Sequence, residues 1–351
     1  EWGAPVEGLA AARRALEDEH GVADRRRLLG LLLGGLVAND RIDEAEAWMP
    51  ARVVALREEG LTAQADLEER RGLTMFGIGD ADTMTVLEGE LAAAGDAPPA
   101  TRADLELTLA ISRLRAEETT AAIALAEAAA DHFDEAGEAA GISAALLTIV
   151  AARSDEGDRP RTAEAIEQLL LVPELSEGRR ARALEYRARV FGGDERYAKG
   201  AADADEVCRI LATIGAASSL ATANVLAGML HEDGGQFAEA VVRYRAGARG
   251  LEEHGASPTA TRYKLGRSML AAGDAVEAVE VLHEVYGAET EAEEPPASRA
   301  QTLMLLSRAF EAAEQYGNAV WAWGNAAELA DEGEAEALAA SALVNRGRLL
   351  M

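Results

Sequence analysis

Small residues recur along this chain about every 40 residues, and this repetition constrains its fold more than any other feature. Two columns of positions carry the repeat. Members of the first column are 37 to 41 residues apart, and eight of the nine positions in each column are small. The first column is Leu33, Gly72, Ala110, Ala151, Ala188, Gly228, Gly266, Ser307 and Gly347. The second column is Gly8, Ala45, Met84, Ala122, Ala163, Gly200, Ala240, Ala278 and Ala319.

This pattern predicts pairs of antiparallel helices. A small residue at a helix crossing lets the two backbones approach closely. Apolar residues flank the columns at helical spacing, and turns such as Gly273-Asp274 separate them. Pro160 falls in the first turn of a second helix, where a missing N–H costs nothing. Pro50 falls inside a predicted helix, so we expect it to kink that helix or end it early.

The pattern resembles the tetratricopeptide repeat. The best matches are Leu265-Gly266 with Gly273-Asp274 and Ala278, then Gly228 with Phe237, Ala240 and Tyr244, and Leu306-Ser307 with Phe310, Tyr316, Ala319 and Trp323. The resemblance implies an all-α fold, a right-handed superhelical solenoid of antiparallel helix pairs. The period here is nearer 40 than the family's usual 34 residues, Met84 occupies a small-residue site, and most family aromatics are aliphatic. Other helical-pair solenoids stay open for residues 20–140.

The repeat count predicts one solenoid over residues 1–351. We expect a lone helix at 5–18 and another at 336–351. Between them we expect helix pairs at about 25–60, 63–95, 101–137, 142–172, 179–215, 219–254, 258–288 and 298–331. The chain thus begins and stops within repeats, without an obvious polar cap. Either it is a fragment, or its ends meet another chain, as in a homo-oligomer.

Composition excludes several other classes of protein. The net charge is 34 − 62 = −28, which argues against a nucleic-acid binder. No run approaches the ~18 apolar residues of a membrane span. The single cysteine, Cys208, rules out a disulfide scaffold, and with no visible secretory signal it favours the cytoplasm. Arginine almost replaces lysine, a bias typical of GC-rich genomes.

No motif predicts catalysis, a cofactor or a metal site. The phosphate-binding, dinucleotide-binding, zinc-protease and serine-hydrolase patterns are absent from the sequence. No histidine lies at a metal-ligand spacing from another histidine or from Cys208, which we predict to be a small core residue. The acidic clusters 289–294 and 331–336 lack the ligand order of a calcium loop, and we expect solvated loops.

The family resemblance implies that the first helix of each pair lines a concave groove that binds peptides. Carried over by position, the predicted partner-binding residues are Arg182, Tyr186, Arg189, Met229, Tyr263, Lys264, Arg267, Met304, Arg308 and Arg348, with Val225 and Val344 beside them. Arginine follows the small residue in four of the last five repeats, a row that could hold an acidic peptide. Alternatively, these arginines pair with glutamates on neighbouring repeats, such as Glu185, Glu232 and Glu311.

The same positions in the N-terminal half are apolar. They are Leu31, Gly34, Val37, Leu73, Phe76, Leu107, Ile111 and Leu114. They form either an exposed interface or, if the register differs by one residue, part of the core. The lysine and asparagine pattern with which one form of the family clamps a C-terminal carboxylate is absent.

The leading hypothesis is a non-catalytic protein-interaction scaffold that binds a partner peptide or helix in the groove. The alternative is the sensor or regulatory arm of a larger signalling protein, such as a transcription regulator or a nucleotide-switch ATPase. An enzyme is the third and least favoured hypothesis, since no pair of titratable groups stands out as an acid–base couple.

Overall fold

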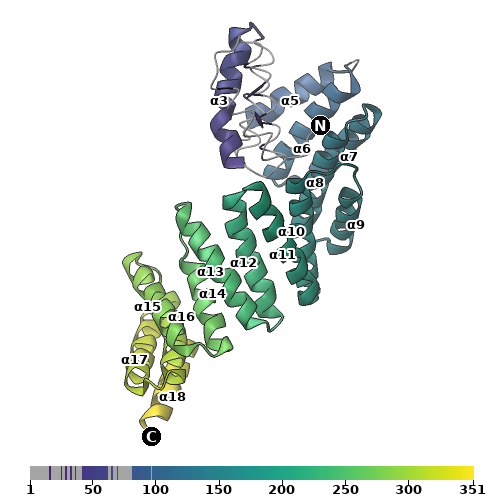
Figure 1. Ribbon diagram of the computed structural model, residues 1–351. Coiled ribbons are helices and arrows are strands. Elements are labelled where there is room, and N and C mark those ends of the chain that lie inside the picture. Colours follow the sequence, from purple (N-terminus) through teal and green to yellow (C-terminus); the bar gives the residue numbers. More distant parts are fainter. Residues whose placement is uncertain are drawn as a thin grey trace. The chain divides into compact units, whose positions relative to one another are not determined.

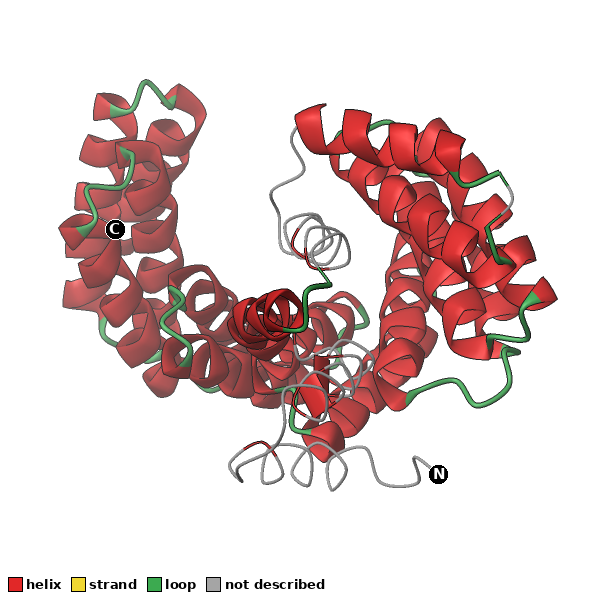
Figure 2. Ribbon diagram, turned by 90° about the horizontal axis from the view of Figure 1, so that it is seen from above, coloured by secondary structure: helices red, strands yellow, loops and turns green. Residues whose placement is uncertain are grey.

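The computed structural model describes residues 42–61, 81–95 and 97–351, with single positions 16, 25, 28, 29, 32, 33, 36, 65 and 69. The lone helix expected at 5–18 and the first-column position Gly72 lie outside these residues. Across the described residues every regular element is a helix and none is a strand (Figures 1 and 2). None of these helices is long and apolar enough to cross a membrane. The predicted all-α fold is confirmed.

The helices fall into two compact units, which divide within α11 and at the start of α12. The first unit contains α3 (Ile42–Glu58), α5 (Ala81–Ala93), α6 (Pro99–Arg115), α7 (Thr119–Glu135), α8 (Ala139–Asp155), α9 (Arg159–Leu170), α10 (Glu177–Gly193) and the later part of α11 (Tyr197–Ile214). The second contains the start of α11, most of α12 (Ala217–Asp233), α13 (Phe237–Glu253), α14 (Thr259–Ala272), α15 (Ala275–Glu291), α16 (Pro296–Ala312), α17 (Tyr316–Glu332) and α18 (Glu336–Leu350).

A residue in the left-handed region separates most successive helices. At Gly235 this residue is a glycine with a φ of +74°. The N–H of the next residue, Gln236, donates a 2.8 Å hydrogen bond to the His231 carbonyl. Glutamate takes the same role at Glu314, where φ is +60°. These tight connections turn each helix back on the one before it, so that neighbours pack antiparallel.

The predicted small residues lie where paired helices cross. A Cβ at Gly228 would be 2.6 Å from the Tyr244 ring, and one at Gly266 would be 2.6 Å from Leu282 Cγ. No side chain larger than hydrogen fits at either crossing without displacing its neighbour. The predicted role of this column is therefore confirmed at both glycines.

One layer of each stack is packed more closely than the other. First helices of successive pairs contact each other, as α6 with α8 and α8 with α10 in the first unit, and α14 with α16 and α16 with α18 in the second. The second helices α13, α15 and α17 make no comparable contact. Each unit therefore curves toward its first helices, which we call the inner layer.

Of the two outcomes expected at Pro50, an early end of the helix is wrong, because α3 continues through Pro50 to Glu58. A second expectation needs correction. The acidic cluster that begins at Glu289 is not wholly a solvated loop, because Glu289 lies in the last turn of α15 and is buried. Thr302 on α16 donates a 3.0 Å hydrogen bond to its Oε1. Burial raises the pKa of Glu289.

Candidate functional site

The ten predicted partner-binding residues all lie on first helices. Arg182, Tyr186 and Arg189 lie on α10 in the first unit. The second unit holds Met229 on α12, Tyr263, Lys264 and Arg267 on α14, Met304 and Arg308 on α16, and Arg348 on α18. The second unit thus carries most of the candidate surface, and its inner layer is described first.

Arg267 is held by a carboxylate of the preceding repeat. Its Nε and Nη2 each donate a 2.7 Å hydrogen bond to Glu232 on α12. The Tyr244 hydroxyl on α13 donates a third bond to Glu232, at 2.8 Å. Burial alone would raise the pKa of Glu232, but the bonds from Arg267 and Tyr244 outweigh it and lower this pKa. Three helices are therefore joined at one carboxylate.

The same arrangement recurs further along the second unit. Glu311 on α16 accepts a 2.7 Å bond from Trp323 Nε1 on α17 and pairs with Arg348 on α18. In both cases the carboxylate follows the small first-column residue by four positions and the aromatic donor follows it by sixteen. The arginine comes one position after the next small residue. We call each such set of three an inter-repeat triad.

Between these two triads the acceptor is missing. Four and sixteen residues after Gly266 the chain has Leu270 and Leu282, which are apolar. Arg308 still occupies the arginine position on α16 and is exposed. Among the described residues no hydrogen bond or ion pair engages Arg308, in contrast to Arg267 and Arg348.

In the first unit the arginines of α10 share one carboxylate. Arg182 and Arg189 bond Glu185 at 3.0 and 2.8 Å. Burial would raise the pKa of Glu185, but these guanidinium groups lower it. Tyr186 beside them is half-buried, and burial raises its pKa. The alternative interpretation, pairing with glutamates on neighbouring repeats, is thus confirmed for Arg267 and Arg348. It is wrong for Arg189, which pairs with Glu185 on its own helix.

Three of the eight apolar positions of the N-terminal half lie within the described residues. Leu107, Ile111 and Leu114 on α6 are half-buried, and Leu107 packs against the core around Phe133. Leu31, Gly34, Val37, Leu73 and Phe76 lie outside the described residues.

Sequence reasoning missed two histidine–carboxylate contacts. His231 Nδ1 lies 2.8 Å from Gln236 Oε1, and its Nε2 lies 3.1 Å from Asp205 Oδ2. Arg243 pairs with the same aspartate at 2.8 Å. His132 Nδ1 lies 2.7 Å from the buried Glu106. The histidine follows its carboxylate by 26 residues in both cases, a spacing that could have revealed them.

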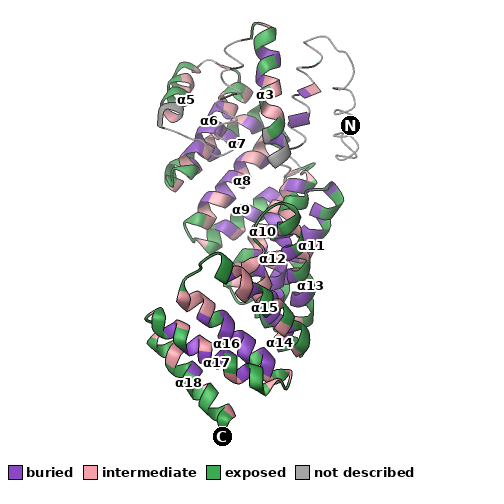
Figure 3. Ribbon diagram, turned by 90° about the vertical axis from the view of Figure 1, so that its left-hand side faces the viewer, coloured by how far each residue is buried: buried purple, intermediate pink, exposed green. Residues whose placement is uncertain are grey.

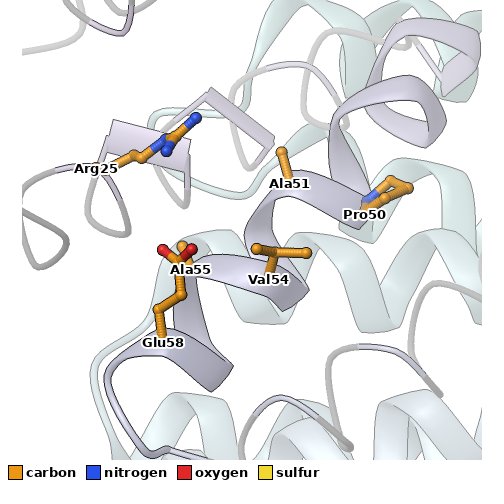
Figure 4. Close-up of a pocket in the computed structure, with 6 residues that line it drawn as sticks. All are labelled: Arg25, Pro50, Ala51, Val54, Ala55 and Glu58. Atoms are coloured by element: carbon orange, nitrogen blue, oxygen red, sulfur yellow. The ribbon is translucent and has the colours of Figure 1, made fainter. Parts of the chain in front are cut away.

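The described residues contain no group of three or more histidine, cysteine, aspartate or glutamate side chains that could hold a metal ion. Cys208 is buried as predicted. A pocket of about 210 Å³ beside α3 is lined by Arg25, Pro50, Ala51, Val54, Ala55 and Glu58 (Figure 4). It is smaller than the ~300–1,000 Å³ typical of small-molecule sites.

The chain is similar to known proteins in its three-dimensional structure and not in its sequence. No family model matches the sequence, and no curated protein matches it. The signal-transduction ATPase of Pyrococcus horikoshii with a tetratricopeptide repeat sensor is similar over 97% of this chain and 52% of its own, with a TM-score of 0.67 and 11% identity. Apo RapI is similar over 94% and 98%, with a TM-score of 0.61 and 11% identity. A Rap protein complexed with Competence and Sporulation Factor is similar over 93% and 97%, with a TM-score of 0.53 and 16% identity.

These similarities agree with the helix pairs, the small residues at the crossings and the closely packed inner layer. The chain therefore has the helical-pair solenoid fold of the tetratricopeptide-repeat proteins.

Proposed function

We propose that this protein is a non-catalytic protein-interaction scaffold, and that the inner layer of its second unit binds an extended segment or a helix of a partner. The supporting observation is the exposure of large side chains on that layer. Met229 is 38% exposed on α12, where Ala221, Ala223, Ala227 and Leu230 are buried, and Val344 is 71% exposed on α18. Apolar side chains on the same layer as the cation Arg308 suit a partner that offers both apolar and acidic groups.

The similar structures support this proposal in general terms. A Rap protein of the same fold has been solved with Competence and Sporulation Factor bound. A curved stack of helix pairs offers a long inner surface to which each repeat contributes a few side chains, so such a fold binds extended ligands well. Arg308, which no carboxylate among the described residues engages, would favour an acidic group locally, against the long-range repulsion from the net charge of −28.

Site-specific photo-crosslinking tests which layer is used. A photoreactive amino acid placed at Met229 or Val344 samples the inner layer. The same amino acid at Val242 or Val276, which are 64% and 62% exposed on second helices, provides matched controls. In lysate of the source organism we expect the same partner to crosslink from Met229 and Val344 and not from the controls. Equal crosslinking from all four positions would contradict the proposal.

A second candidate is the sensor or regulatory arm of a larger signalling protein. It is favoured by the similarity to the ATPase with a tetratricopeptide sensor, which this chain matches over almost its whole length while covering 52% of that protein. An antibody raised against this chain would decide by the size of the native polypeptide. A band far above 36.9 kDa supports the sensor arm, and a band at that mass contradicts it.

A further inference from the structure

The second unit keeps an arginine where its acceptor has been lost. In two pairs of successive repeats the arginine position holds an arginine and the acceptor position holds a carboxylate, as with Arg267 and Glu232. One step earlier in the sequence the acceptor and aromatic positions hold Gly192 and Ala204, and the arginine position holds Met229. There the acceptor and the cation are absent together. Only at the step of Leu270 does the cation, Arg308, remain without a carboxylate among the described residues.

The surroundings of Arg308 would suit an anionic group. Tyr263 lies on α14, which contacts the helix α16 that carries Arg308. Burial raises the pKa of Tyr263, so its hydroxyl stays protonated and can donate a hydrogen bond. Leu270, Tyr263 and Met304 pack against the core of the unit and are only partly buried.

Two acidic groups also face this region. Glu232 already accepts three hydrogen bonds, from Arg267 and Tyr244. Glu289 is buried and accepts a hydrogen bond from Thr302, and no ion pair joins it to Arg308 among the described residues. Neither carboxylate therefore satisfies Arg308.

We propose that Arg308 and Tyr263 together bind the carboxylate of an aspartate or glutamate side chain from the partner. That carboxylate gives Arg308 the acceptor that Glu232 and Glu311 give Arg267 and Arg348 in the two complete triads, so the ligand supplies the missing member. Arg308 contributes the charge and the paired donors of a guanidinium group. Tyr263 contributes the hydroxyl, as Tyr244 does toward Glu232. This assignment rests on the proposed function and names the chemistry of its ligand.

Two variants of this site test the assignment against matched controls. Arg308→Met removes the cation, and its control, Arg249→Met, removes an equally charged side chain that is 77% exposed on α13. Leu270→Glu supplies the carboxylate from within the chain, and its control, Val276→Glu, adds the same charge to an exposed site on α15. Leu270→Glu should raise the thermal midpoint by giving Arg308 a carboxylate to pair with, whereas Val276→Glu should not.

The probe is a randomised, acetylated and C-terminally amidated peptide library with adjacent glutamates fixed at its centre. The same library with glutamine at those positions is the reference. We expect the full chain to retain the glutamate library, and both Arg308→Met and Leu270→Glu to retain about tenfold less, which corresponds to roughly 1.4 kcal/mol. Arg249→Met and Val276→Glu should retain as much as the parent.

Three results would overturn the assignment. They are equal retention of the glutamate and glutamine libraries, equal retention by the parent and Arg308→Met, and stronger Arg308-dependent retention of a phosphoserine library, which would reassign the site to phosphate. If the full chain does not retain the glutamate library in preference to the glutamine library while crosslinks from Met229 and Val344 persist, the scaffold function is supported and the carboxylate site at Arg308 is not. If those crosslinks are also absent, the proposed function fails as well.

Discussion

At the residue scale, the arginines of the inner layer differ in what they stabilise. Arg267→Met leaves Glu232, whose side chain is only 9% exposed, with Tyr244 as its remaining donor. Leaving a buried carboxylate short of partners should cost about 1–3 kcal/mol, and the half-exposed Arg267 favours the lower end. Arg249→Met should change stability by less than about 0.5 kcal/mol. Denaturant unfolding followed by circular dichroism measures both, and equal stabilities would contradict a structural role for the triad.

Two glutamates of the second unit should respond to pH with opposite signs. The pKa of Glu232 is lowered in the folded protein, so its contribution is present above the unfolded pKa of about 4.3 and is lost as pH falls through the folded pKa. Glu232→Gln should therefore lower the thermal midpoint at neutral pH and have less effect in acid.

The pKa of Glu289 is raised by burial, so the folded state is penalised above that pKa and relieved once pH falls below the unfolded value. Glu289→Gln should raise the thermal midpoint at neutral pH, and this gain should shrink in acid. Melting curves of the parent and both glutamine variants between neutral pH and about pH 4 compare the two signs. Shifts of the same sign for both variants would contradict this account.

At the element scale, the first small-residue column should tolerate a larger side chain only on a helix whose small residue is not covered by a second helix. A side chain at Gly266 meets Leu282, so Gly266→Val should destabilise the protein by about 1–3 kcal/mol. A Cβ at Gly347 on α18 would have no neighbour within 4 Å, and α18 is largely exposed (Figure 3). Gly347→Ala should stabilise by up to about 1 kcal/mol through helix propensity.

A second substitution tests the cause at Gly266. Leu282→Ala in the Gly266→Val background makes room for the added side chain, so the double variant should lose less stability than the two single changes together. Additive losses measured by denaturant unfolding would show that the crossing is not the site of strain.

The helices could be predicted from the sequence because their signals are local. Column spacing and apolar periodicity placed the small residues, and Gly228 and Gly266 do lie at crossings. The pairing of each arginine depends on which nearby carboxylate its side chain reaches. The sequence places glutamates both on the same helix and on the neighbouring one, so it does not decide between them. Arg189 pairs with Glu185 on its own helix, whereas Arg267 reaches back to α12. That Arg308 lacks a carboxylate could not be predicted from the sequence, because the acceptor position, held by Leu270, is defined only by comparison with the two complete triads.

At the scale of the whole molecule, a net charge of −28 opposes compaction, while the ion pairs oppose that repulsion. Most of the pairs are exposed and contribute little each, and the carboxylates of the triads are partly buried and hence less screened. Raising NaCl from about 0.01 to about 0.1 M shortens the Debye length from about 30 to about 10 Å, which weakens the long-range repulsion most. We therefore expect the thermal midpoint to rise.

Calorimetry at neutral pH measures this response, and choline chloride in place of NaCl controls for specific cation binding. Arg267→Met should show a similar rise from a lower midpoint, because the triad it breaks is short-ranged and its carboxylate is mostly shielded from salt. A midpoint that falls with salt in the parent would mean that attraction within the ion pairs exceeds the repulsion of the net charge. The triads would then contribute more to holding the stack together than their partial exposure suggests.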